Sequence, residues 1–391
     1  MTQANNNTYD VLSDDGQSYY IGMMSGTSLD ALDAVLCQFI DNQPKIIATH
    51  SRPFEPQLRQ MLLALCTPNG TQALATGQYT QFSELDFWGL ASRLYAKFAS
   101  QVVNALLEQA DVDPFDVVAI GCHGQTVRHR PEWGFSLQLL DPNILAERTN
   151  ITVVSDFRRR DMAVGGQGAP LVPAFHQAMF GHLAAADSAC VVLNLGGIAN
   201  ITVLGETVIG YDTGVANLLM DAWIDRYQGK SYDKSGEWAK SGAVDFVLLD
   251  KLMVHPFLSQ SAPKSTGREA FHLAWLDEIL ADFAITAQDV QATLCEFTAL
   301  SASREIAKFA KKHNQLLVCG GGAYNTHLLS RLAALLPDWQ IADSEAAGIS
   351  PSWVEALAFA WLARQNILMQ TSSLPTVTGA NKAVVLGVTC F

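Results

Sequence analysis

Three glycine-containing turns follow apolar runs in this sequence, and each has residue types that bind phosphate. The first turn holds Ser25, Gly26, Thr27 and Ser28 and ends at Asp30. Small hydroxyl residues and glycine let backbone N–H groups approach anionic oxygens closely. Asp30 can hold Mg²⁺ through water molecules, because magnesium gives up its hydration shell reluctantly. The turn is not a Walker loop, and an ordinary hairpin turn is the alternative interpretation.

The second and third turns are richer in glycine. The second contains Asn194, Gly196 and Gly197, and the third contains Gly320, Gly321, Gly322 and Asn325. Each follows an apolar run that is typical of a buried strand, at residues 189–195 and 315–319. The third turn also opens a predicted helix, where a phosphate or a flat ligand can lie against the backbone. A single glycine-rich turn has a simple structural explanation, but three in the same position after a strand favour a shared phosphate site.

Two carboxylates stand where α/β proteins place catalytic groups. Asp212 ends a short predicted strand and precedes a predicted helix at residues 217–227. A carboxylate in that position commonly faces a cleft, and it can act as a general base on a hydroxyl group or a water molecule. Capping of the helix is the alternative role. Glu355 begins a predicted last helix at residues 353–369, either as an acid of the first turn or as an acceptor for a sugar hydroxyl.

A charged, glycine-rich segment at residues 156–173 combines three arginines, two aspartates and three glycines. Arginine binds carboxylates and phosphates, so Arg159 and Arg160 are candidate ligands for an anionic sugar substituent. A solvated charged loop is the alternative. Gln125 and Thr126, after a predicted strand at residues 117–121, can hydrogen-bond sugar hydroxyls.

Strands that alternate with helices predict an α/β fold. The hairpins that contain the first and second turns look alike, which suggests two similar halves around a shared cleft. We expect a loose tail over residues 1–18, an N-terminal lobe over residues 19–185 and a C-terminal lobe over residues 186–391. The last helix can pack back on the first lobe.

The composition of the chain excludes some classes of protein and some kinds of partner. The chain has 391 residues, of which 49% are hydrophobic and 16% charged, so an entirely disordered protein is excluded. A net charge of −13 argues against nucleic acid and anionic membrane surfaces as partners. The seven cysteines are scattered, and neither a secretory signal nor an apolar run long enough for a membrane span is visible. These features predict reduced thiols in a cytoplasmic protein.

Taken together, these motifs resemble those of the anhydro-N-acetylmuramic acid kinases, over about residues 19–388. The matching segments are 22–30, 123–126, 156–173, 194–197, 210–212, 263–269 and 319–325. The resemblance implies a two-lobed actin/hexokinase-like (ribonuclease H-like) fold with ATP and Mg²⁺ between the lobes. It further implies a homodimer.

The resemblance also implies roles for residues. The turns at 25–30 and 194–200 become the two phosphate loops and the turn at 320–325 the adenosine loop, with Asp212 as the catalytic aspartate and Glu355 near the sugar. Asp212 would activate the water that opens the 1,6-anhydro ring, and the released oxygen would attack the γ-phosphoryl group of ATP. Two departures from the family pattern are Ala31, where glycine is usual, and Val215-Ala216, where Pro-Gly is usual.

Three other functions remain open at this point. The chain could phosphorylate another hexose or an N-acetylhexosamine, or it could be an ATP-driven filament or chaperone module. It could also be a glycosidase with Asp212 and Glu355 as its paired carboxylates, which would need no ATP.

Overall fold

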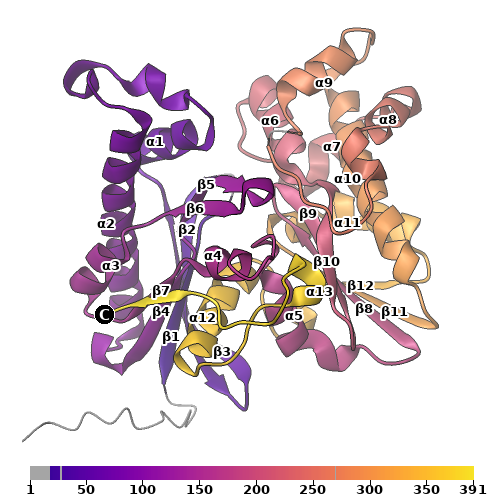
Figure 1. Cartoon of the computed structure of the whole chain (residues 1–391). Coiled ribbons are helices and arrows are strands. Elements are labelled where there is room, and N and C mark those ends of the chain that lie inside the picture. Colours follow the sequence, from indigo (N-terminus) through magenta and orange to yellow (C-terminus); the bar gives the residue numbers. More distant parts are fainter. Residues whose placement is uncertain (1–17, 27–28, 269) are drawn as a thin grey trace, which may run out of the picture.

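The computed structural model describes residues 18–26, 29–268 and 270–391. Almost all of the expected N-terminal tail lies outside these ranges, as do Thr27 and Ser28 of the first turn. Two large sheets organise the described chain (Figure 1). None of the described helices is both long enough and apolar enough to cross a bilayer.

The first sheet has six strands in the order β13-β7-β4-β1-β2-β3. Its strands are β1 (Tyr19–Met24), β2 (Ala31–Ile40), β3 (Gln43–Pro53), β4 (Val117–Cys122), β7 (Val153–Ser155) and β13 (Val388–Cys390). The second sheet has five strands in the order β10-β9-β8-β11-β12. Its strands are β8 (Ser188–Leu195), β9 (Ile198–Leu204), β10 (Ile209–Val215), β11 (His313–Cys319) and β12 (Gln340–Asp343). A small hairpin of β5 (Gln125–Arg130) and β6 (Phe135–Leu139) stands apart.

The two sheets share one topology. In the first, β1 is antiparallel to β2 and parallel to β4, and β4 is parallel to β7. In the second, β8 is antiparallel to β9 and parallel to β11, and β11 is parallel to β12. Only β13, an antiparallel strand at the edge of the first sheet, has no counterpart. The repeated topology agrees with two similar halves and with the expected actin/hexokinase-like fold, while the boundary at residue 185 stays a prediction.

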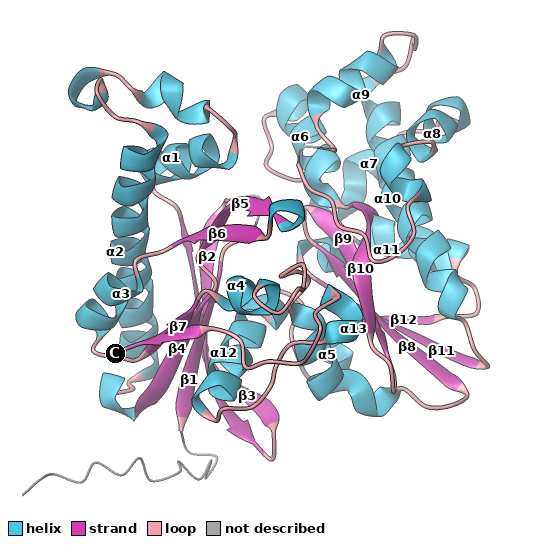
Figure 2. Ribbon diagram, in the orientation of Figure 1, coloured by secondary structure: helices cyan, strands magenta, loops and turns pink. Residues whose placement is uncertain are grey.

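Helices cover both sheets and also fill the space between them (Figure 2). The helices are α1 (Pro56–Cys66), α2 (Glu84–Ala110), α3 (Pro142–Thr149), α4 (Phe157–Met162), α5 (Val172–Phe180), α6 (Asn217–Gln228), α7 (Glu237–Ser241), α8 (Phe246–Met253), α9 (Leu273–Leu280), α10 (Ala287–Ile306), α11 (Thr326–Leu335), α12 (Val354–Ile367) and α13 (Pro375–Thr378). One core packs α1, α2 and α3 on the first sheet, and another packs α6 to α11 on the second. The third core joins the inner faces of both sheets through α5 and α12.

Two glycines allow α12 to lie directly on the first sheet. A Cβ atom on Gly22 of β1 would stand 1.9 Å from the carbonyl oxygen of Ala356, and one on Gly121 of β4 would stand 1.9 Å from that of Phe359. No side chain fits at either position, so the backbones of helix and sheet are in contact. This close packing fixes the start of α12, which carries Glu355.

The structure differs from the sequence-based expectations in two places. First, α12 is not the last element, because α13 and β13 follow it and β13 completes the first sheet. Second, β10 does not end at Asp212 but continues to Val215 across an irregularity between Asp212 and Gly214. All seven cysteines are free thiols.

Candidate active site

Most of the predicted site residues follow the carboxyl ends of parallel strands. In the first sheet Met23 pairs with Cys122 and Gly121 with Val154, so the segments after β1, β4 and β7 leave the sheet at one edge. In the second sheet Asn194 pairs with Cys319, which brings the second and third glycine turns to one edge as well. This is the position at which open α/β sheets bind ligands.

A buried hydrogen-bond network supports the start of the first turn at Ser25. Ser25 is 2% exposed, and its hydroxyl donates to Oε1 of Gln125 over 2.8 Å and lies 3.2 Å from the Tyr95 hydroxyl. The amide of Gln125 donates to the carbonyl oxygen of Thr126, whose hydroxyl accepts a bond from Gln138. Gln125 and Thr126 therefore support the first turn, and their contact with sugar hydroxyls stays a prediction.

Asp30 lies at the open end of the same turn. Its side chain is 68% exposed and forms an ion pair with Arg59 over 3.4 Å. Its charge also reaches Asp221 on α6, where burial, Asp30 and Asp233 together raise the pKa to about 7. Asp30 thus faces an element of the other half of the molecule. Among the described residues, no three acidic, histidine or cysteine side chains converge as a ready metal site.

The second and third turns touch each other and the start of α6. The carbonyl oxygen of Gly197 accepts bonds from the N–H groups of Ala216 and Leu218, at 3.0 and 3.2 Å. Gly320 has a positive φ of 78°, and a Cβ atom there would lie 2.5 Å from Oδ1 of Asn194, so only glycine fits.

The remaining residues of these two turns are less crowded or otherwise engaged. Nothing lies within 4 Å of a Cβ atom built on Gly321, so its backbone faces open space. The backbone of Gly196 accepts the N–H of Asn217, which ties this turn to α6 as well. Asn325 accepts the N–H of Leu328 and thereby caps α11, which gives it a structural role besides the predicted contact with ATP.

Asp212 is held by a separate segment of chain. Its Oδ2 atom accepts the backbone N–H of Thr266 over 2.9 Å, and its own N–H donates to the carbonyl oxygen of Lys264 over 3.1 Å. The residue that caps α6 is Ala216, so the alternative of a helix-capping Asp212 is wrong. The irregularity of β10 directly after Asp212 is a feature that turns side chains toward active sites.

Arg158, which is not among the predicted site residues, lies within electrostatic reach of both Asp212 and Glu355. Its guanidinium donates to Nε2 of His123 over 3.2 Å and to the carbonyl oxygen of Gly168 over 2.8 Å. Burial lowers the pKa of Arg158 to about 10, against the opposing influence of the Glu355 and Asp212 carboxylates. The charges of Asp212 and Glu355 therefore both act on one half-buried cation.

Burial also shifts the pKa values of the neighbouring Glu355 and His123. It raises the pKa of Glu355, with a further increase from Asp33 and opposing effects of a hydrogen bond from Asn194 and the charge of Arg158. His123 is 4% exposed, and burial together with Arg158 holds its pKa well below the usual value. A neutral His123 accepts the bond from Arg158 on Nε2, which places its own proton on Nδ1.

The other two arginines of the segment lie on the outer side of α4. Arg159 is exposed and pairs with Asp156, and Arg160 is exposed as well. The structure thus brings Arg158, rather than these two, to the carboxylates. The glycine run that follows is fixed by Asp161, which is 0% exposed and accepts bonds from the Gly168 N–H and the Thr378 hydroxyl, both over 2.8 Å.

Comparisons with known proteins point to a single family. The sequence profile described as anhydro-N-acetylmuramic acid kinase matches residues 18–391. The enzyme of that name from Psychrobacter cryohalolentis is 56% identical, with 97% of this chain and 95% of the relative covered. That from Shewanella sp. (strain MR-4) is 48% identical, with 95% and 98% covered.

Among solved structures, component A of the (R)-2-hydroxyglutaryl-CoA dehydratase of Acidaminococcus fermentans is 11% identical, with a TM-score of 0.46 and coverage of 90% of this chain and 99% of that one. The profile match over nearly the whole chain and the 56% identity to a relative covered almost in full lead to one conclusion: this chain belongs to the anhydro-N-acetylmuramic acid kinase family.

Proposed function

We propose that the protein uses ATP to convert anhydro-N-acetylmuramic acid and water into N-acetylmuramic acid 6-phosphate and ADP, as a step in the recycling of cell-wall sugars. The observation that carries the proposal is the match of residues 18–391 to the kinase family, in a chain that orients Asp212 through the backbone N–H of Thr266. A kinase for another hexose is not favoured by the family, and neither is a glycosidase or a filament protein.

Asp212 is proposed as the general base. A water proton passes to its carboxylate while the water oxygen bonds to the anomeric carbon of the sugar. The bond from that carbon to the bridging oxygen breaks, and its electron pair stays on the oxygen, which attacks the γ-phosphoryl group and displaces ADP. The Thr266 N–H on Oδ2 orients the carboxylate for the proton transfer.

Glu355 and Arg158 are proposed to bind the sugar. The raised pKa of Glu355 suits a group that exchanges hydrogen bonds with a hydroxyl, and the guanidinium of Arg158 suits an anionic or partly charged oxygen. Arg159 and Arg160 remain proposed contacts for the anionic substituent as it approaches from solvent. Gln125 and Thr126 remain proposed contacts for sugar hydroxyls.

The three turns are proposed to hold ATP. The phosphates would meet the turns at 25–30 and 194–197, and the adenosine would lie against the open backbone at Gly321. Asp30 fits Mg²⁺ held mainly by water and phosphate, because a single exposed carboxylate is a common protein ligand for that ion. When bound, the ion neutralises phosphate charge.

The test replaces Asp212 with asparagine and measures turnover and ATP binding. Asp212→Asn should lower kcat by at least about 10³-fold, since the base and the water activation are lost together, while the Kd for ATP changes little. Asp225→Asn, on the exposed side of α6, is the matched control and should keep full activity. Near-normal turnover of Asp212→Asn would remove this residue from the proposed role.

The products distinguish the coupled reaction from a plain kinase or hydrolase. With ATP in water labelled with heavy oxygen, mass spectrometry should find the label at the anomeric hydroxyl and phosphate at the sixth carbon. Phosphorylation without ring opening, or ring opening without ATP, would contradict the proposal.

The proposed setting is a homodimer in the cytoplasm, as the family resemblance implies, where seven unpaired thiols remain reduced. Sedimentation of the purified protein tests the dimer.

A further inference from the structure

A buried ion pair lies behind Asp212 and has no part in the reaction proposed above. Lys264 and Glu305 are 3.1 Å apart, and their side chains are only 1% and 9% exposed. Lys264 belongs to the segment 263–269 that the sequence analysis singled out, whereas Glu305 is on α10. Removing two charges from water costs several kcal/mol per ion, so the pair must be held by further contacts.

Those contacts are present on both sides. The ammonium group of Lys264 also donates to the carbonyl oxygen of Leu258 over 3.4 Å and lies 5.0 Å from the Phe257 ring centroid. The carboxylate of Glu305 accepts the Tyr211 hydroxyl over 2.9 Å and an ion pair from Lys308. Burial would raise the pKa of Glu305, but hydrogen bonds from Lys308, Tyr211 and Lys264 lower it below the usual value, so the group is an anion.

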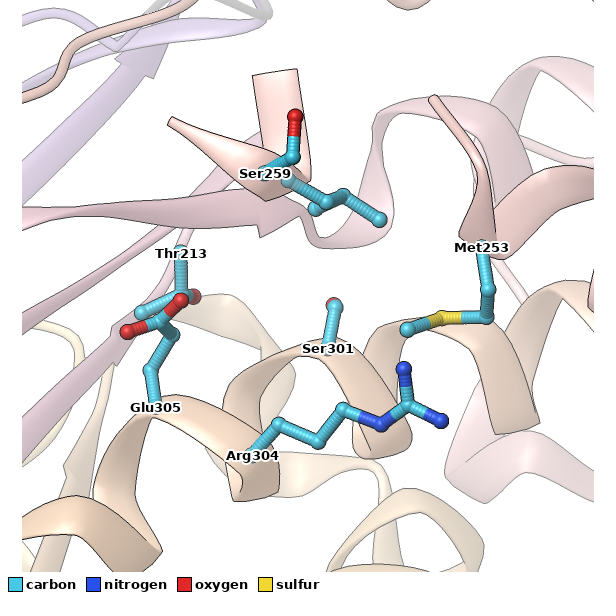
Figure 3. A pocket seen from close by; sticks show the side chains of 7 residues that line it. Thr213, Met253, Ser259, Ser301, Arg304 and Glu305 are labelled. Atoms are coloured by element: carbon cyan, nitrogen blue, oxygen red, sulfur yellow. The ribbon is translucent and has the colours of Figure 1, made fainter. Parts of the chain in front are cut away.

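The network touches Asp212 from two directions. Tyr211 is its neighbour in β10 and is tied to Glu305 through the hydroxyl. Lys264 and Thr266 supply the carbonyl oxygen and the N–H that bond the backbone and the carboxylate of Asp212. Thr213, the next residue in β10, lines a cavity of about 220 Å³ together with Glu305, Ser301 and Arg304 (Figure 3).

The cavity interrupts the core beside Thr213, between the buried Tyr211 and Val215 of β10. The contacts of Lys264 and Glu305 therefore add to the side-chain packing that holds this strand. From this geometry we infer that Lys264 and Glu305 are positioning residues, which hold the segment 264–266 so that the Thr266 N–H orients the Asp212 carboxylate. The inference rests on the proposed role of Asp212.

The experiment compares Lys264→Met and Glu305→Gln with Lys308→Met. The first two break the pair, and the third removes a ligand of the same carboxylate that is 59% exposed and does not reach the segment 264–266. Misplacement of a catalytic group by about 1 Å costs roughly 10²-fold in rate. We expect Lys264→Met to lower kcat by about that factor with little change in KM for either substrate, and Glu305→Gln to act in the same direction but less strongly.

The pH profile separates positioning from a merely structural role. Loss of the N–H donor should move the acidic limb of kcat to higher pH in Lys264→Met and Glu305→Gln, but not in Lys308→Met. Lower thermal stability with unchanged kcat and pH profile in the folded variants would overturn the inference. If Lys264→Met does not fold, Glu305→Gln decides by the same two measurements.

Asp212→Asn keeps the two proposals apart. If Asp212→Asn is active, Asp212 is not the general base. If Asp212→Asn is inactive while Lys264→Met and Glu305→Gln keep full activity, only the positioning role of the ion pair is excluded.

Discussion

Arg158 shows how helix geometry separates three adjacent residues of one type. In α4 the positions 161 and 162 are buried, and Arg158 precedes them by three and four residues, so it lies on the same face. Arg159 and Arg160 point to the opposite side and are exposed. The spacing of Arg158 relative to Asp161 and Met162 was the signal in the sequence that could have selected it.

The role of Arg158 is testable by removing its charge. Arg158→Met should lower kcat/KM by about 10²-fold to 10³-fold, because loss of one preorganised donor has effects of that size. Steady-state kinetics with both substrates measures it. Arg226→Met is the control, since Arg226 pairs with Asp277 near the surface, and it should keep normal kinetics. Equal kinetics for both variants would exclude Arg158 from the site.

At the scale of elements, α12 is the support for Glu355 and depends on glycines in the first sheet. Gly121→Ala would place a Cβ atom 1.9 Å from the carbonyl oxygen of Phe359, so the helix must move away from β4. Overpacking of this kind costs about 1–3 kcal/mol. We expect a lower thermal midpoint and a lower kcat, because Glu355 moves with the helix.

Gly89→Ala is the matched control for this prediction. Gly89 is exposed in the second turn of α2, and nothing is within 4 Å of a Cβ atom built there. This substitution should leave kcat unchanged and stabilise the protein by about 0.5–1 kcal/mol, since alanine favours the helix. A Gly121→Ala variant that is as stable and active as Gly89→Ala would contradict the proposed contact between helix and sheet.

The elements that were predictable from sequence are those whose apolar runs are continuous. The strands around residues 19–24, 117–122, 188–195 and 313–319 have buried interiors, and the second and third glycine turns directly follow β8 and β11, as expected. In contrast, β3 has no fully buried residue, which leaves no apolar run to detect. The continuation of β10 past Asp212 depends on pairing with β9, a contact that local sequence does not encode.

The same distinction applies to the site. The backbone turns could be predicted, because glycine at a strand end has a local meaning. Arg158, His123 and Asp161 act through partners far away in the chain, such as Glu355 and Thr378, and only the fold brings these together.

At the scale of the whole molecule, the pKa of Asp221 depends on carboxylates from both halves of the chain. This residue has a pKa of about 7 because of burial and the nearby carboxylates of Asp30 and Asp233. An unfolded aspartate titrates near pH 4, so the folded state holds an extra proton between about pH 4 and 7. The free energy of unfolding therefore falls as the pH rises through this interval, by at most about 1.4 kcal/mol per pH unit from this group.

Asp221→Asn removes that dependence. The variant should have a higher thermal midpoint than the unmodified protein at pH 8, and the two should converge near pH 4. Thermal unfolding at both pH values measures it, with the exposed Asp225→Asn as control. A difference between Asp221→Asn and the unmodified protein that is the same at both pH values would contradict the linkage.

The return of the chain to its first sheet has a consequence for synthesis. Glu355, the Thr378 hydroxyl that holds Asp161, and the edge strand β13 are all made after both glycine turns of the second sheet. A nascent chain on the ribosome therefore lacks the proposed sugar ligand Glu355 until α12 has left the exit tunnel. A polypeptide released before this helix is made would lack that ligand, although the turns at 25–30 and 194–197 would already be present.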